Sequence, residues 1–258
     1  KKNMKIEYCT VLIFPLMLLA AAMDLPWLPT NSIINSGMEE ENYFKKINNP
    51  FFSETSNSER KIGLIKALHP DVSIYHAWAS DPYGNAVFAP PYGGDIYGAY
   101  ACNGPVIVTA ERIVDTKYIR KHRDYVRLPG HIVSAVVELP YGCHPSMFYG
   151  LDGGGYMEDI SFLLNFHNNN RTPEKLHEFV KKWVLDVKDF DEYKKKIGVE
   201  KLLELSGRLD PLSWKEDLKS RMNAIDDINS RPINELERLV LIASEVIAET
   251  IKKKKYEI

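Results

Sequence analysis

Three short apolar runs restrict the folds open to this chain more than any other feature of its sequence. They are VSIYHA at 72–77, VIVTA at 106–110 and IVSAVVEL at 132–139. Continuously apolar, β-branched segments of this length are typical of parallel strands buried on both faces of a sheet. Helical patterns lie between and after the runs. The sequence therefore predicts an α/β fold with an open, mostly parallel sheet flanked by helices.

The segment before the first run carries a helical pattern of its own. Residues 11–23 predict a buried helix in which Pro15 is tolerated in the first turn. Lysines ahead of this stretch imitate an export signal, but Glu7 lies among them and the apolar stretch is too short to span a bilayer. A proline-stiffened segment follows at 24–29. We therefore expect a buried helix that leads into a strand.

Amphipathic patterns predict helices in the last third of the chain. Residues 176–187 and 192–205 form two of them, and 234–254 carry apolar side chains at spacings of three and four. An apolar stripe of this kind needs a surface to cover. We therefore divide the chain into a main lobe at 1–232 and a C-terminal helix at 233–258. That helix either opens a second lobe or docks back on the first.

Composition excludes several classes of function. With 33 basic and 35 acidic residues the net charge is −2, so no basic field is available to bind nucleic acid. The three cysteines, Cys9, Cys102 and Cys143, form no CxxC pair and predict no disulfide framework, which favours a cytoplasmic protein. The seven histidines show no metal-binding spacing. We expect no metal, no nucleic acid and no membrane partner.

Five groups of short motifs follow one another along the chain. They are AAAMDLPWLP at 20–29 with NSG at 35–37; PDVSIYHA at 70–77 with DPYGN at 81–85; TAERIVD at 109–115; LPG at 128–130 with PYGCHPS at 140–146 and YG at 149–150; and WVLD at 183–186 with DEY at 191–193 and IG at 197–198. Each group alone is weak, but their order and separations resemble the A (alpha) subunits of family I coenzyme A transferases, glutaconate CoA-transferase most of all. The resemblance covers roughly residues 8–205.

This resemblance implies a CoA-transferase/NagB-like fold and transfer of CoA between an acyl-CoA and a carboxylic acid. A glutamate carboxylate attacks the acyl-CoA, and the CoA thiolate then attacks the anhydride to leave a glutamyl-CoA thioester. CoA is thus a substrate, and no separate cofactor is implied. The glutamate is expected on a partner, the B (beta) subunit or a fused second lobe, because no segment here resembles its surroundings. The family's N-terminal glycine-rich turn is unmatched as well, so the first strand and helix units are expected to be missing.

The candidate substrate-binding residues are small or polar and lie in two loops. They are Asn35, Ser36 and Gly37 in the first loop, and Gly142, His144 and Ser146 in the second. The first loop follows an extended segment and offers backbone and hydroxyl donors to a carboxylate. The second follows a predicted strand, and parallel sheets bind ligands beyond the carboxyl ends of their strands. For both loops the alternative is a plain structural turn.

Three further residues have simpler interpretations. Glu138, at the end of a predicted buried strand, is the only acid we consider as an in-chain catalyst, and a hydrogen-bonded strand-end carboxylate is the alternative. His76 lies within a strand and is predicted to be a packed core histidine. Glu111 is expected in a helix start or turn, and the cysteines are expected to be small apolar packing residues.

Two other functions remain open beside that of a transferase. One is a role in a CoA-dependent ring-opening hydrolase with the same fold, and the other is a non-catalytic scaffold. A glutamate nucleophile in the partner half favours transfer over hydrolysis. Acyl-CoA turnover by the purified complex excludes the scaffold. The sequence does not name the acids that are exchanged.

Overall fold

The computed structural model describes residues 6–52, 61–207, 238–240 and 242–245. The chain divides into two compact units, Lys1–Leu209 and Asp210–Ile258. In the second unit the described residues are helical, as the amphipathic pattern predicts, and the remainder of the predicted helix lies outside the described part of the chain. The expected boundary at 232/233 also lies outside it.

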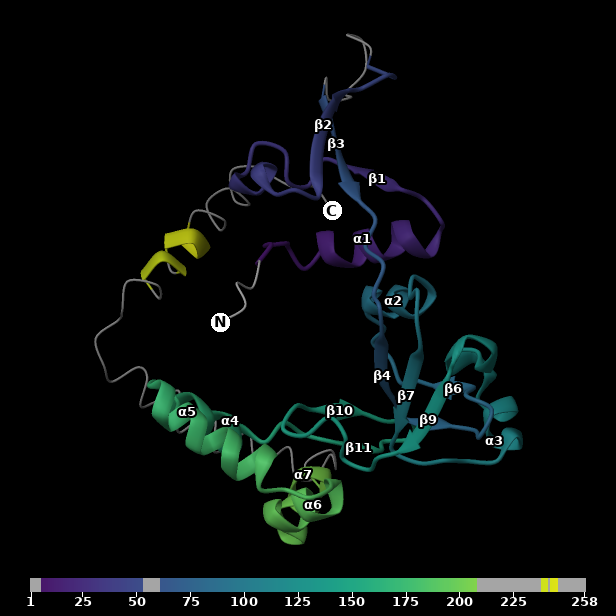
Figure 1. The fold of residues 1–258 in the computed structure, drawn as a ribbon, viewed down its shortest axis with the longest axis vertical. Helices are drawn as coiled ribbons and strands as arrows, with labels where there is room; N and C mark the ends of the chain where they lie inside the picture. Colours follow the sequence, from purple (N-terminus) through teal and green to yellow (C-terminus); the bar gives the residue numbers. More distant parts are fainter. Residues whose placement is uncertain (1–5, 53–60, 208–237, 241, 246–258) are drawn as a thin grey trace. The chain divides into compact units, whose positions relative to one another are not determined.

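The three apolar runs form the predicted parallel sheet. They become β4 (Ser73–Ala77), β7 (Val106–Ala110) and β9 (Ala135–Glu138), in the order β4-β7-β9. Both pairings are parallel, with Ile74 opposite Ile107 and Thr109 opposite Val137. Figure 1 shows these strands side by side. The predicted α/β class is therefore confirmed.

The third strand is shorter than predicted because its first residues turn. Residues Gly130–Ile132 form a 3-10 helix, η4, in which Ile132 N donates to Pro129 O at 3.2 Å. The ladder begins only when Ser134 N donates to Val106 O at 2.7 Å. Local hydrogen bonding thus competes with the strand and shortens it from its N-terminal end.

The sheet is buried on one face and partly open on the other. Ala77, Val108 and Ala110 are fully buried and pack with Leu128 in one core cluster. On the opposite face Ile74 is 66% exposed and Val137 is 46% exposed. Only the His76 end of this second face is covered, by Gly142 and Phe148, so the expectation that both faces are buried holds in part for the described residues.

An antiparallel sheet and a helix form the beginning of the first unit. The helix α1 (Ile13–Ala22) has Pro15 in its first turn, and Ile13 and Met17 pack with Phe44 and Ile65 of the sheet. The prediction of a buried helix leading into a strand is confirmed. The sheet has the order β1-β3-β2, and its strands are β1 (Trp27–Thr30), β2 (Phe44–Asn48) and β3 (Lys61–Lys66).

A second small sheet is organised by one buried carboxylate. Its strands, in the order β5-β6-β8, are β5 (Ala79–Ser80), β6 (Ala86–Val87) and β8 (Val126–Leu128). Asp81, fully buried, accepts hydrogen bonds from the backbone N–H groups of Tyr83 and Asn85 and from the Thr116 hydroxyl. This explains the DPYGN motif, because Asp81 satisfies the turn that joins β5 to β6. Two short helices, α2 (Tyr97–Tyr100) and α3 (Thr116–Lys121), complete this region together with the 3-10 helix η2 (Gly94–Ile96).

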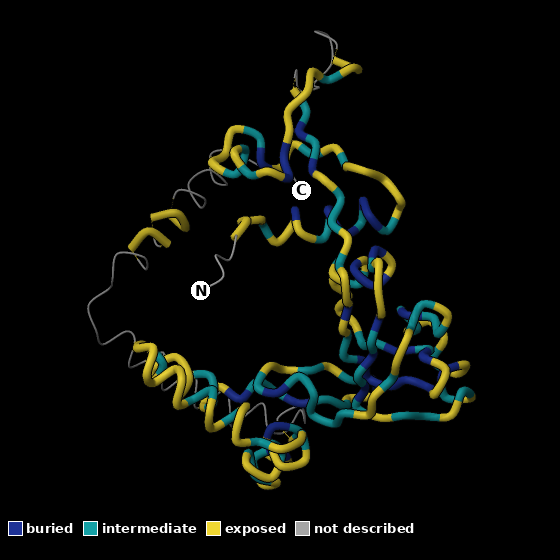
Figure 2. Tube along the Cα trace, viewed as in Figure 1, coloured by how far each residue is buried: buried dark blue, intermediate teal, exposed yellow. Residues whose placement is uncertain are grey.

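Helices dominate the end of the first unit. They are α4 (Ile160–Asn169), α5 (Pro173–Val180), the π-helical turn η5 (Lys181–Leu185), α6 (Phe190–Ile197) and α7 (Val199–Gly207), and they follow the hairpin of β10 (Phe148–Tyr149) and β11 (Gly155–Tyr156). Figure 2 shows α4 and α5 as largely exposed, and neither has a buried residue. The predicted helix at 192–205 is split into two, since Gly198 adopts a φ of +98° and turns the chain.

Candidate functional site

The Glu111 carboxylate, directly after β7, joins the carboxyl ends of the parallel strands. Its Oε1 lies 2.7 Å from His76 Nε2 of β4 and accepts a 3.0 Å hydrogen bond from the Tyr156 hydroxyl. Its Oε2 accepts a 2.9 Å bond from Tyr141 N. The Glu111 side chain is only 11% exposed. It therefore connects two strands, a loop and a hairpin, and is not a simple turn residue as we predicted.

This network fixes the first half of the PYGCHPS loop against the sheet. Tyr141 adopts a φ of +65°, uncommon for a residue with a side chain, and Cys143 N donates to Tyr156 Oη at 2.8 Å. Gly142 lies on the His76 ring, where an added Cβ would be 2.5 Å from His76 Cε1. The structure thus places Gly142, a predicted substrate-binding residue, against His76. His76 is packed, as predicted, and it also contacts the Glu111 carboxylate.

His76 itself has both ring nitrogens occupied. Its Nδ1 lies 2.8 Å from Thr109 Oγ1, and Thr109 in turn donates to Tyr75 O. Phe148 contacts the ring edge-on, with 4.8 Å between centroids. The ring is therefore held in a single orientation at the end of β4.

The second half of the loop is held by a different network. His144 was expected to meet substrate, but its side chain is only 1% exposed. Its Nδ1 lies 2.8 Å from the Tyr193 hydroxyl and its Nε2 lies 3.2 Å from Asp159 Oδ2. A neutral ring with the proton on Nε2 satisfies both contacts. Asp159 and Tyr193 thus enclose His144 in the described structure, and its role in substrate binding stays a prediction.

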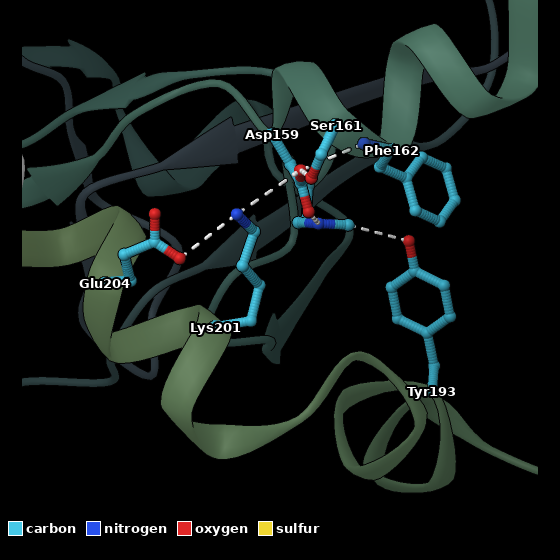
Figure 3. A network of polar contacts seen from close by, with 7 residues as sticks. Asp159, Ser161, Phe162, Tyr193, Lys201 and Glu204 are labelled. Carbon is cyan, nitrogen blue, oxygen red and sulfur yellow. Dashed lines mark hydrogen bonds and ion pairs between the residues drawn. The ribbon is translucent and has the colours of Figure 1, made fainter. Parts of the chain in front are cut away.

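Asp159 organises this second network at the N-terminus of α4. It accepts hydrogen bonds from the Ser161 hydroxyl and from Phe162 N, and Lys201 of α7 lies 3.9 Å away. Figure 3 shows Lys201 between Asp159 and Glu204, with Tyr193 approaching from α6. The network therefore ties the PYGCHPS loop to α4, α6 and α7.

Burial and hydrogen bonds shift the pKa values of the titratable side chains in the two networks. Burial lowers the pKa of His144 despite the adjacent carboxylate. Burial also opposes ionisation of Asp159, but hydrogen bonds from Ser161, Phe162 and His144 outweigh it and lower the pKa of that carboxyl. Burial raises the pKa of the Cys143 thiol to about 11 and raises the pKa of Tyr156, which also lies beside the Glu111 charge. Cys143 is therefore a neutral thiol at physiological pH.

A cavity of about 370 Å³ lies beside the first network. Its lining includes His76, Cys143, Tyr92, Asp95 and Arg127. The volume falls within the range of small-molecule sites. The polar groups of the lining include a histidine held by Glu111, a neutral thiol, one guanidinium and the Asp95 carboxylate, a set that can bind and orient a ligand. Glu111, with three donors on its two oxygens, is unsuited to act as a nucleophile here.

The remaining predicted residues lie away from this cavity's lining. Ser36 caps the 3-10 helix η1 (Gly37–Glu40) by accepting from Met38 N, and Asn35 has a φ of +63°. Gly37 meets nothing within 4 Å of an added Cβ. These three residues therefore form one turn of their own.

Glu138 and Ser146 are both exposed. Glu138 accepts a 2.9 Å hydrogen bond from Ile113 N at the end of β9, the arrangement we gave as the alternative to catalysis. Ser146 N donates to Cys143 O at 2.9 Å. A catalytic role of Glu138 and a substrate-binding role of Ser146 stay predictions.

Sequence reasoning missed Glu111, Tyr156 and Arg127. Glu111 carried a usable signal, because it follows a predicted strand directly, as the PYGCHPS loop does. Tyr156 and Arg127 carried none, since their partners are set by tertiary folding. Cys9 differs from expectation too, because it is exposed and not packed.

The described residues offer neither a metal centre nor a membrane span. Within them, no group of three or more His, Cys, Asp or Glu side chains is placed to hold a metal ion. None of the helices that the structure describes is long and apolar enough to cross a membrane.

The chain is similar in sequence to A subunits of CoA-transferases. No family model matches it. It is 35% identical over 205 residues to the A subunit of glutaconate CoA-transferase from Acidaminococcus fermentans, an alignment that covers 72% of this chain and 60% of that relative. It is 29% identical over 180 residues to the A subunit of 3-oxoadipate CoA-transferase from Pseudomonas knackmussii, covering 69% of this chain and 59% of that relative.

A solved structure gives the same answer for the fold. The crystal structure of glutaconate coenzyme A-transferase from Acidaminococcus fermentans superposes with a TM-score of 0.67 at 33% identity, covering 75% of this chain and 63% of that chain. The chain thus spans about three fifths of the relatives it matches. On this sequence and fold similarity, it is a homologue of the A subunits of CoA-transferases.

Proposed function

We propose that this chain is part of an enzyme that transfers CoA from an acyl-CoA to a carboxylic acid. The observation that carries the proposal is the 35% identity to the A subunit of glutaconate CoA-transferase over 205 residues. The cavity beside strand β4, which has His76 and Cys143 in its lining, is of a size that suits a small-molecule ligand. The chain's role is to bind and orient substrate, and its setting is the cytoplasm.

The nucleophile comes from a partner half in this proposal. That half is a B subunit or a fused second lobe, and its glutamate attacks the thioester carbonyl to form an acyl-glutamyl anhydride and CoA thiolate. The thiolate then attacks the glutamyl carbonyl, which releases the donor acid and leaves a glutamyl-CoA thioester. The acceptor acid reverses both steps. Supporting this division, the Glu111 carboxylate already has three hydrogen-bond partners, and Glu138 accepts a hydrogen bond from Ile113 N.

The experiment uses the complex of this chain with its partner half. The complex is supplied with a panel of acyl-CoA donors and carboxylate acceptors, and new acyl-CoA is measured by chromatography. We expect acceptor-dependent acyl-CoA formation with ping-pong kinetics. Intact-mass analysis after incubation with donor alone should find CoA attached to the partner half. Each half alone should transfer nothing.

Other outcomes separate the alternatives. Release of free CoA with no acceptor-dependent product would point to the hydrolase, and no acyl-CoA turnover by the intact complex would point to the scaffold. Transfer by this chain alone would contradict the assignment of the nucleophile to the partner.

A further inference from the structure

One segment of the chain, residues 88–96, forms most of the wall of the 370 Å³ cavity. It supplies more than half of the lining residues, and strands β4 and β8 and the PYGCHPS loop supply the others. Both ends of the segment are fixed, because Phe88, Ala89 and Ile96 pack against buried core clusters. The segment lies outside the strands, between β6 and α2. A shift of its middle alone would therefore open the cavity wall while the core stays packed.

The middle of the segment has few backbone ties to the rest of the protein. Among the described residues, none makes a backbone–backbone hydrogen bond with residues 89–92. Two of these four residues are prolines, which have no N–H to donate. Bonds to other segments lie on either side of this stretch, where Phe88 N donates to Tyr125 O at 3.0 Å and the Tyr75 hydroxyl donates to Asp95 O at 2.6 Å. Stretches of this kind open locally at low cost, because little hydrogen bonding is lost.

A contact between two side chains ties the middle of the segment to strand β8. The Arg127 guanidinium lies 4.4 Å from the centroid of the Tyr92 ring, a cation–π contact. No ion pair found among the described residues involves Arg127, so no carboxylate there competes with the ring. The Tyr92 hydroxyl contacts Phe88 O of its own segment, at 3.4 Å, and adds no tie to β8. With Tyr92 41% exposed, loss of the contact should shift an opening equilibrium by about 2- to 5-fold.

Transfer of CoA requires that water be kept from the thioester. At a glutamyl-CoA thioester, a water oxygen can bond to the carbonyl carbon while the C–S bond breaks, which leaves a glutamic acid side chain and the CoA thiol. Closed sites prevent such side reactions by excluding water. We propose that segment 88–96 is a lid, that the Tyr92–Arg127 contact holds it closed, and that the closed lid favours transfer of CoA to an acid over hydrolysis. The last part rests on the proposed function, whereas the lid itself does not.

Cys143 reports the position of the lid, because it lines the cavity that the segment walls. The complete enzyme with its partner half is labelled with iodoacetamide, and peptide mass spectrometry follows the rate at Cys143. Tyr92→Leu removes the ring, and Tyr92→Phe keeps it. The matched control is Tyr83→Leu, because Tyr83 is 76% exposed and lies outside both the segment and the lining. Cys102, partly buried and outside the lining, reports general loosening in the same samples.

We expect Tyr92→Leu to speed labelling of Cys143 by about 2- to 5-fold, the factor set by one partly exposed cation–π contact. Tyr92→Phe and Tyr83→Leu should label at the wild-type rate, and the rate at Cys102 should not change. Arg127→Gln should give the same increase from the other side of the contact. The double variant should add nothing to either single variant, because both remove one interaction. Should Tyr92→Leu fold poorly, Arg127→Gln serves in its place.

A second measurement asks what the lid does for the reaction. The complete enzyme is supplied with an acyl-CoA donor and an acceptor acid, and the CoA released as free thiol is compared with the new acyl-CoA formed. Tyr92→Leu and Arg127→Gln should raise the ratio of hydrolysis to transfer by about 2- to 5-fold, in step with the faster labelling. Tyr92→Phe and Tyr83→Leu should keep the wild-type ratio.

Labelling of Cys143 at the wild-type rate in both Tyr92→Leu and Arg127→Gln would overturn the lid. An equal increase in Tyr83→Leu, or at Cys102, would overturn it too, because general loosening would then explain the change. Faster labelling with an unchanged ratio of hydrolysis to transfer would overturn the role in the reaction. Failure of the proposed function looks different, since wild type then forms no acyl-CoA while labelling of Cys143 still depends on the Tyr92–Arg127 contact.

Discussion

Replacing Glu111 by Ala tests whether its hydrogen-bond network holds the site together. The change removes the acceptor of three hydrogen bonds at once, from His76, Tyr156 and Tyr141 N. The His76 and Glu111 side chains are only 10% and 11% exposed, so water cannot fully replace the lost acceptor. Leaving a buried donor without its acceptor costs about 1–3 kcal/mol, and three donors lose their acceptor here. We expect the free energy of unfolding to fall by about 3 kcal/mol or more.

Glu138→Ala is the matched control for this prediction. Glu138 follows the neighbouring strand β9, is exposed, and accepts one hydrogen bond, from Ile113 N. Its loss should cost about 1 kcal/mol or less. The loss of unfolding free energy in Glu111→Gln should lie between those of the two alanine variants. The glutamine keeps one acceptor oxygen, but its amide N–H groups face a donor that the second carboxylate oxygen served. Guanidinium denaturation followed by tryptophan fluorescence gives all three values. A Glu111→Ala cost within about 1 kcal/mol of the Glu138→Ala cost would refute the reasoning.

Three further predictions concern the loop at 140–146. Because burial lowers the pKa of His144 below its ordinary 6.5, the unfolded state binds more protons as the pH falls below that value. Stability should therefore decline with falling pH from about 6.5, and His144→Gln should flatten that slope in denaturation curves measured across pH. Gly142→Ala places a Cβ 2.5 Å from the His76 ring, so it should lower the melting temperature, and a melting temperature equal to wild type would contradict the contact. The Cys143 thiol, with its pKa raised to about 11, should react with iodoacetamide more slowly than the exposed Cys9, and peptide mass spectrometry checks the order.

Local sequence patterns were sufficient for much of the fold. The apolar runs at 72–77 and 106–110 became β4 and β7 almost residue for residue, since short β-branched segments bounded by turns have few alternatives. The helix at 11–23 was found for a similar reason, with Pro15 in the turn where it is tolerated. The order of the short motifs was enough to find the CoA-transferase relatives.

Sequence patterns were insufficient where two kinds of local structure compete for the same residues. The predicted strand at 132–139 lost its first residues to the turn at Gly130–Ile132, and the predicted helix at 192–205 broke at Gly198. Both outcomes depend on small differences between local hydrogen-bonding options. Periodicity alone does not measure such differences.

The sequence by itself determined the class of fold, the family resemblance and the stretch of chain that follows the parallel strands. Only the tertiary structure decided the roles of the side chains there. His144 and His76 both follow or end a strand, yet one is enclosed by Asp159 and Tyr193 while the other lies beside a cavity. Glu111 meets donors up to 45 residues away in the chain. A carboxylate or imidazole takes its role from the burial and partners that folding brings to it, and those distant contacts leave no trace in local spacing.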